Sequence, residues 1–136
     1  MRMNQRGFTL TEIMIVIMIV GIMATIAAPP LFRYVASNRL QTQTDRLAAD
    51  LLYARALAVS TNSSMRFTST ADGYNLTNAA GDVVREREFK HGLNLAQEQI
   101  ANFYPWGMAD ARVFNMTNST GTLTVNLMPT GMVEVH

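Results

Sequence analysis

The sequence predicts an α+β fold in which one long N-terminal helix, transmembrane in its first part and amphipathic in its second, packs on an antiparallel β-sheet head domain. Residues 13–28 form an uncharged apolar run, which indicates a helix that can enter a membrane. Residues 63–136 consist of short alternating segments separated by Gly, Pro, Asn and Asp, which is typical of antiparallel strands. The chain has 136 residues and no cysteine, so we expect one globular core without disulfides.

The apolar run is long enough to cross a bilayer. Residues 8–28 would span about 31 Å as a helix, close to the thickness of the hydrocarbon layer. We therefore expect residues 8–30 to lie in the membrane. Arg2 and Arg6 precede the run without an acidic residue, and the positive-inside rule then predicts a cytoplasmic N-terminus. Everything after Pro30 should lie across the membrane.

Glu12 argues against an ordinary secretory signal peptide and against an ordinary single-pass anchor. Both would have an uninterrupted apolar core after the basic leader. A carboxylate at the edge of a spanning segment costs about 2 to 3 kcal/mol on insertion, so Glu12 indicates a functional charge partner. The small residue suited to a peptidase, Gly7, precedes the apolar run instead of following it. Cleavage there would keep the helix.

The helix is predicted to continue beyond the membrane as an amphipathic segment, residues 31–62. Pro29 and Pro30 each remove a helical hydrogen bond, and we expect the helix to kink there. It should not end, because residues 31–60 contain no Gly or Pro. Charged residues are expected mostly off the core-facing side, namely Arg39, Arg46, Asp50 and Arg55. That side is predicted from the helical spacing of Leu40, Leu47, Leu51, Ala54 and Ala58.

The head, residues 63–136, is predicted to be a series of strands and turns. Residues 85–88 read Arg-Glu-Arg-Glu, which places arginines on one face of a strand and glutamates on the other. We interpret this segment as a solvated edge strand, with a docking patch as the alternative. Strands are expected at 65–68, 74–77, 83–89, 93–95, 113–116, 122–127 and 132–135, with an irregular stretch through 103–107.

Residues 6–12, Arg-Gly-Phe-Thr-Leu-Thr-Glu, together with the apolar run resemble the class III signal of type IV pilins and type II secretion pseudopilins. The resemblance implies that a prepilin peptidase removes a leader, residues 1–7, by cutting between Gly7 and Phe8, and that Phe8 is then N-methylated. It also implies that the Phe8 ammonium of one subunit meets the Glu12 carboxylate of its neighbour in a filament, so that each offsets the other's loss of hydration.

Other stretches resemble the GspH/FimT group of minor pilins and pseudopilins, namely 37–40, 54–58 and 127–131. This implies a minor pilin that primes or joins a type IV pilus, with a GspH-like pseudopilin as the alternative. The implied partners are other pilin or pseudopilin subunits, prepilin peptidase, the inner-membrane assembly platform and membrane lipid. A DNA-uptake pilin is a weaker alternative, because the tail 131–136 lacks basic residues and the net charge is only +1. Nucleic acid is not an expected partner.

Composition and motifs favour a structural role over an enzymatic one. His91 and His136 lie far apart without a local carboxylate cluster, so we expect no metal site. No serine or threonine has a neighbouring base, and no phosphate-binding or dinucleotide-binding motif occurs. We therefore expect no catalytic residue and no cofactor. Residues 103–106, Phe-Tyr-Pro-Trp, are predicted to cover one end of the sheet core, with partner contact as the alternative.

Overall fold

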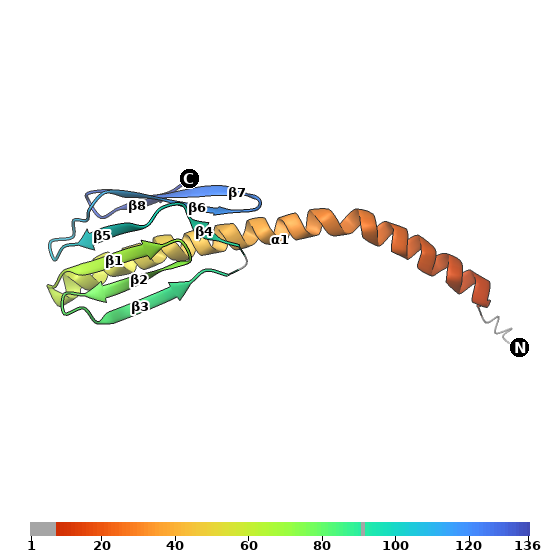
Figure 1. Cartoon of the computed structure of the whole chain (residues 1–136), viewed down its shortest axis with the longest axis horizontal. Helices are drawn as coiled ribbons and strands as arrows, with labels where there is room; N and C mark the ends of the chain where they lie inside the picture. The colour runs from red at the N-terminus through yellow and green to blue at the C-terminus, as the bar shows by residue number, and fades with distance from the viewer. Residues whose placement is uncertain (1–7, 91) are drawn as a thin grey trace, which may run out of the picture. The chain divides into compact units, whose positions relative to one another are not determined.

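The computed structural model describes residues 8–90 and 92–136. Two compact units divide the chain, one ending at Val35 and the other comprising Ala36–His136. The helix α1, Leu10–Thr61, contributes residues to both units (Figure 1). Pro29 and Pro30 lie inside α1, so the helix does not end at them. The kink that they are expected to cause stays a prediction.

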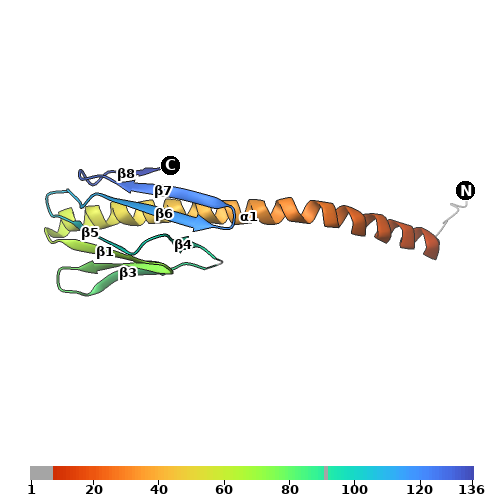
Figure 2. The same ribbon diagram turned by 45° about the horizontal axis from the view of Figure 1, so that its top comes forward.

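The second unit, called the head from here on, contains two antiparallel sheets and residues 36–61 of α1, the head helix. The first has the strand order β3-β2-β1-β5 and the second the order β4-β6-β7-β8. Figures 1 and 2 show that residues 36–61 of α1 lie alongside the strands. The antiparallel α+β fold is therefore confirmed. The bounds are β1 Met65–Thr70, β2 Gly73–Asn78, β3 Val83–Glu88, β4 Asn94–Leu95, β5 Gln99–Phe103, β6 Arg112–Asn118, β7 Gly121–Leu127 and β8 Val133–Val135.

One strand was not predicted. Strand β5 begins at the last residue of a polar Gln-Glu-Gln run, residues 97–99, which interrupts the apolar alternation typical of a strand. It forms because it pairs with β1 from Phe103 opposite Met65 to Gln99 opposite Ser69. Tertiary pairing thus overrides a weak local preference for strand.

The predicted core face of the helix is confirmed. The five leucines and alanines of that face are all buried, and they pack with apolar residues from both sheets. Phe67 and Phe114 meet edge to face, with ring centroids 5.4 Å apart. Each large apolar side chain buried in this way contributes about 1.5 to 3 kcal/mol. Asp50 is buried among them, so its predicted position off the core face was wrong.

Candidate functional site

The N-terminal end of α1 is closed by its own side chains. Thr9 precedes the helix, and its Oγ1 accepts a hydrogen bond of 3.2 Å from the backbone N–H of Glu12. In return the Thr9 backbone N–H points to Glu12 Oε2 at 3.4 Å. This is a capping box, which satisfies two helix-end donors reciprocally. The Thr-x-x-Glu spacing could have revealed it from the sequence.

Of the two residues at the predicted cleavage site, the structure describes only Phe8. Phe8 precedes α1 and is 79% exposed, while Gly7 lies outside the described residues. Cleavage at Gly7, methylation of Phe8 and a filament partner for Glu12 therefore stay predictions. Since a capping box also uses the Glu12 carboxylate, that residue has a local role that the sequence interpretation did not include.

In the first unit, residues 13–27 of α1 are all exposed, and apart from Gly21 and Thr25 they carry apolar side chains. The most apolar window of α1 has a mean hydropathy of 2.4 and none of that window is buried within the chain. Among the described residues, α1 is the helix long and apolar enough to cross a membrane. Thr25 interrupts the run with a hydroxyl, which donates to the carbonyl oxygen of Ile22 at 2.7 Å. Every polar side-chain donor from Ile13 to Ala28 is thereby satisfied, as lipid surroundings require.

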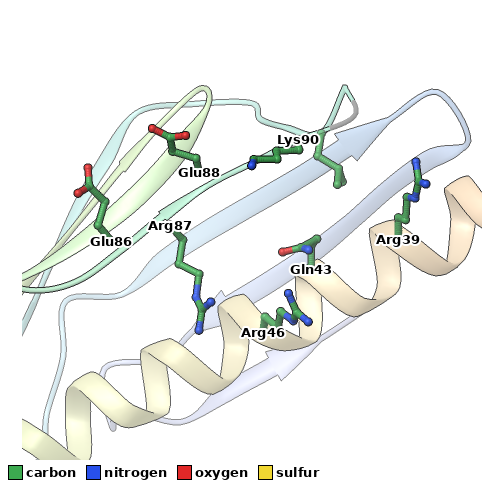
Figure 3. A pocket seen from close by; sticks show the side chains of 8 residues that line it. Arg39, Gln43, Arg46, Glu86, Arg87, Glu88 and Lys90 are labelled. Atoms are coloured by element: carbon green, nitrogen blue, oxygen red, sulfur yellow. The ribbon is translucent and has the colours of Figure 1, made fainter.

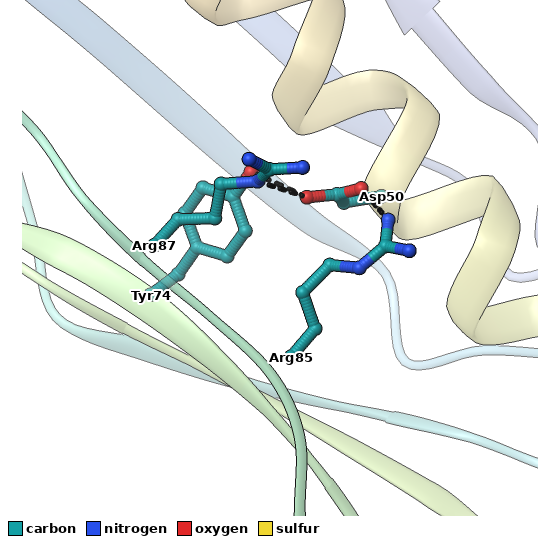
Figure 4. Close-up of polar contacts among 4 residues, drawn as sticks. All are labelled: Asp50, Tyr74, Arg85 and Arg87. Carbon is teal, nitrogen blue, oxygen red and sulfur yellow. Dashed lines mark hydrogen bonds and ion pairs between the residues drawn. The ribbon is translucent and has the colours of Figure 1, made fainter.

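A buried carboxylate joins the head helix to the outermost strand of the first sheet (Figure 4). The side chain of Asp50 is 7% exposed. Its Oδ2 accepts hydrogen bonds from the Tyr74 hydroxyl at 2.8 Å and from Arg87 Nε at 3.1 Å. Its Oδ1 pairs with Arg85, whose guanidinium also lies 4.2 Å from the ring centroid of Tyr53. The carboxylate is thus fully paired.

These contacts determine how the groups titrate. Burial by itself would raise the pKa of Asp50, but the hydrogen bonds from Tyr74, Arg87 and Arg85 outweigh it and lower that pKa. Burial and the adjacent Asp50 carboxylate both raise the pKa of Tyr74. Asp50 is therefore ionised and Tyr74 is neutral at physiological pH, which is the pairing that the hydrogen bonds require.

The two faces of the edge strand β3 carry opposite charges and have different surroundings. Its position at the sheet edge is as predicted, and Glu86 and Glu88 are exposed. Arg85 and Arg87 are not simply solvated, because both reach Asp50. The alternating charges therefore serve two purposes. The arginines bind the edge strand to α1 through Asp50. The glutamates place negative charge on its outer face, which disfavours pairing with another strand.

Two turns of the same type lie at one end of the head. In the first, the Gly107 N–H bonds the Tyr104 carbonyl at 2.9 Å and the Tyr104 N–H bonds the Met108 carbonyl at 2.9 Å. In the second, Gly131 and Met128 make the equivalent bonds, both at 2.8 Å. Each turn has Pro at its second position and a glycine of positive φ at its fourth, +86° and +74°.

Arg55 holds the first of these turns against the helix. Its Nε donates to the Gly107 carbonyl at 2.9 Å. Arg55 was among the charged residues expected mostly off the core-facing side of the helix. Trp106, at the tip of the turn, stacks on Tyr104 with centroids 4.9 Å apart. Trp106 is 69% exposed, so it does not cover the sheet core as predicted. Only Phe103 of that aromatic cluster is fully buried.

Within the part of the chain that the structure describes, no group of three or more His, Asp or Glu side chains could hold a metal ion. His136 Nε2 lies 3.5 Å from Glu134 Oε2 at the C-terminus, and His91 is outside the described residues.

Two family models match the sequence. The prokaryotic N-terminal methylation motif matches residues 2–28, and type II transport protein GspH matches residues 43–133. Comparison with curated proteins finds no significant match.

Two solved structures resemble the fold, both of the type IV minor pilin FimU from Pseudomonas aeruginosa strain PAO1. The crystal form in space group P21 has a TM-score of 0.62 and 21% identity, and the match covers 76% of this chain and 92% of that chain. The form in space group P65 has a TM-score of 0.57 and 20% identity, covering 71% and 91%. At this identity the likeness shows the fold alone.

Proposed function

Since this chain belongs to the family of type II transport protein GspH, we propose that it is a minor pilin, a structural and assembly-priming subunit of a type IV pilus. The observation that carries the proposal is the difference in burial between the first and the second part of α1. The methylation motif matches the part of α1 whose apolar window is not buried within the chain, whereas the second part of α1 is buried in the core of the head. An exposed apolar helix is stable in lipid or against other such helices, which are the two surroundings of a pilin before and after assembly.

The processing steps follow from the N-terminal motif. Prepilin peptidase cuts between Gly7 and Phe8, removes residues 1–7 and methylates the Phe8 amine. Before assembly the protein is a single-pass inner-membrane protein, with residues 8–30 in the bilayer, a cytoplasmic N-terminus and a periplasmic head. The basic leader and the apolar window support this orientation. The assembly platform then transfers the subunit from membrane to filament.

Glu12 provides the charge for subunit pairing. Among the described residues its contact with Thr9 uses Oε2 only, and the bond is long at 3.4 Å. Oε1 is therefore able to accept the methylated Phe8 ammonium of a neighbouring subunit without loss of the capping box. In an apolar filament core both ions would otherwise carry a large desolvation cost, so their pairing favours assembly at this register.

A pseudopilin of a type II secretion system is the second candidate. The match to type II transport protein GspH across residues 43–133 favours it. Both candidates use the same N-terminal chemistry, and both are structural subunits without catalysis. They differ in the machine that the filament belongs to.

Deleting the gene in its native host distinguishes the two. For a minor pilin, we expect fewer pili in sheared cell-surface fractions, unchanged major pilin in membranes, and normal secretion of exoproteins. An epitope-tagged copy should restore piliation and be recovered in the pili in small amounts. Normal piliation with exoproteins retained in the periplasm would contradict the pilus assignment and support the pseudopilin. Normal piliation and normal secretion would contradict both.

A further inference from the structure

A groove of about 650 Å³ lies between α1 and the segment that includes β3 and the residues following it (Figure 3). Arg39, Gln43 and Arg46 form its helical wall, because positions spaced by four and three residues share one face of a helix. Arg87, Lys90 and Leu93 contribute to the other wall. The groove belongs wholly to the head.

Charges are separated across β3. In Figure 3 the Arg87 side chain extends towards the helix, while Glu86 and Glu88 extend from the strand away from it. This follows from the alternation of side chains along a strand. The basic groups therefore face the groove, and the carboxylates lie along its outer rim.

Three of the groove's cations lack a carboxylate of their own. In the described residues, the ion pairs of the head join Asp50 to Arg85 and Arg87, and Glu134 to His136. None of the ion pairs among those residues includes Arg39, Arg46 or Lys90. Asp50 is already neutralised by its two arginines. The groove consequently has a net positive charge that a ligand can compensate.

We infer that this groove is a docking site for an acidic segment of a neighbouring filament subunit, with Asp or Glu carboxylates held by Arg39 and Arg46. The inference rests on the proposed function, which places other subunits against the head. Arginine forks bind carboxylates with two parallel hydrogen bonds, and two forks separated by two helical turns suit a segment with spaced acids.

Other features of the groove favour a peptide over a chain of phosphates. Gln43 is half-buried in the groove, and its amide can pair with a peptide backbone. Glu86 and Glu88 at the rim would repel phosphates that continue out of the groove, but could pair with basic side chains of a peptide. Nucleic acid carries a charge at every phosphate and would bring more negative charge to this rim than a peptide whose acids are spaced apart.

Fluorescence anisotropy of the full-length protein in non-ionic detergent tests the ligand class. The probe is a short labelled peptide of alternating aspartate and alanine. We expect the double variant Arg39→Gln/Arg46→Gln to bind it about tenfold more weakly than wild type, as the loss of two exposed ion pairs would give. The matched control is Arg66→Gln/Arg112→Gln, which removes the same charge from exposed strand positions outside the groove. It should bind nearly as well as wild type.

Two results would overturn the inference. Equal weakening in both double variants would mean that only net charge matters. Binding of inorganic pyrophosphate or of phosphatidylglycerol vesicles that depends on Arg39 and Arg46, with no binding of the aspartate peptide, would assign the groove to phosphate instead. Circular dichroism of both double variants checks that the head remains folded.

A photo-crosslinking amino acid at Gln43 in cells tests the partner. The expected adduct joins Gln43 to an Asp- or Glu-containing segment of another pilin or pseudopilin. Replacing that acid by lysine should lower the yield, and Arg39→Glu/Arg46→Glu should restore it. An adduct to a segment without acids, in a protein that still enters pili, would refute the groove and leave the proposed function intact. Absence of the wild-type protein from pili would instead refute the function.

Discussion

Arg55 Nε donates a hydrogen bond of 2.9 Å to the carbonyl oxygen of Gly107, joining the head helix to a turn 52 residues further along the chain. The second turn packs onto the same contact, because a Cβ atom added to Gly131 would lie 2.6 Å from Arg55 Nε and from the Gly107 oxygen. The Ala109 N–H bonds the Pro129 carbonyl at 3.0 Å and ties the two turns together. The Arg55 guanidinium thus contacts both turns at this end of the head.

Gly131→Ala should destabilise the head by about 3 kcal/mol, because it combines a left-handed backbone with a collision. The matched control is Gly81→Ala. Gly81 has φ +92°, but a Cβ there meets no atom within 4 Å. It should cost only the backbone strain, about 1 to 2 kcal/mol. Denaturant unfolding measures both, and equal losses would mean that contact with Arg55 does not constrain the turn.

Asp50→Asn should lower the free energy of unfolding by about 2 kcal/mol at neutral pH, because the charge-assisted hydrogen bonds are lost. The arginines are partly exposed, so they regain water and limit the loss. The pKa of Asp50 in the folded head lies below its ordinary value of 3.8. Its stabilisation is therefore fully present above about pH 5, about one unit above the unfolded pKa, and is lost as pH falls through the folded pKa.

Unfolding curves of wild type and Asp50→Asn, measured from neutral pH to pH 3, test this directly. The difference between them should be constant above about pH 5 and shrink below about pH 4. Asp45→Asn, at an exposed position of the same helix, should change stability by less than about 0.5 kcal/mol. A stability difference that grows towards acidic pH would show that folding raises the pKa of Asp50 instead of lowering it.

Mass spectrometry of protein extracted from host membranes should show the chain beginning at Phe8, with the added mass of one methyl group. The basis is the matched methylation motif and the position of Gly7 before the apolar run. The same protein from a strain without prepilin peptidase should retain residues 1–7. Cleavage after Ala27 or Ala28, as in a secretory signal peptide, would contradict the pilin assignment.

Glu12→Gln separates the charge from the helix cap, because glutamine can still complete a capping box. We expect both Glu12→Gln and Glu12→Ala to remain in membranes and to be depleted in pili. The Phe8 ammonium of the neighbour would be left unpaired, a cost of about 3 to 5 kcal/mol or more than two decades in association. Glu12→Asp, with the charge on a shorter arm, should be intermediate.

The measured quantity is tagged protein in sheared pili relative to membranes. Wild-type recovery of Glu12→Gln together with loss of Glu12→Ala would assign Glu12 to the cap instead of the filament. Wild-type recovery of both would leave no assembly role for the carboxylate.

The local sequence pattern was sufficient for features that depend on neighbouring residues. The apolar run and the helical repeat of Leu40, Leu47 and Leu51 were predicted from one segment each, because helix geometry relates residues three and four positions apart. The Thr9 to Glu12 spacing is equally local, but the helix cap that it forms was not predicted. The alternation of charges in β3 likewise indicated an edge strand. The α+β class follows from the same short-range periodicities.

Only the tertiary structure decided which partners the polar residues of the head would meet. Asp50 appears in the sequence as one more charge on an amphipathic helix, and its burial depends on Tyr74, Arg85 and Arg87, which follow 24 to 37 residues later. Arg55 has its acceptor 52 residues away, and β5 exists because β1 offers it an edge. Such pairings depend on how separate elements pack, and no periodicity within one segment encodes that geometry.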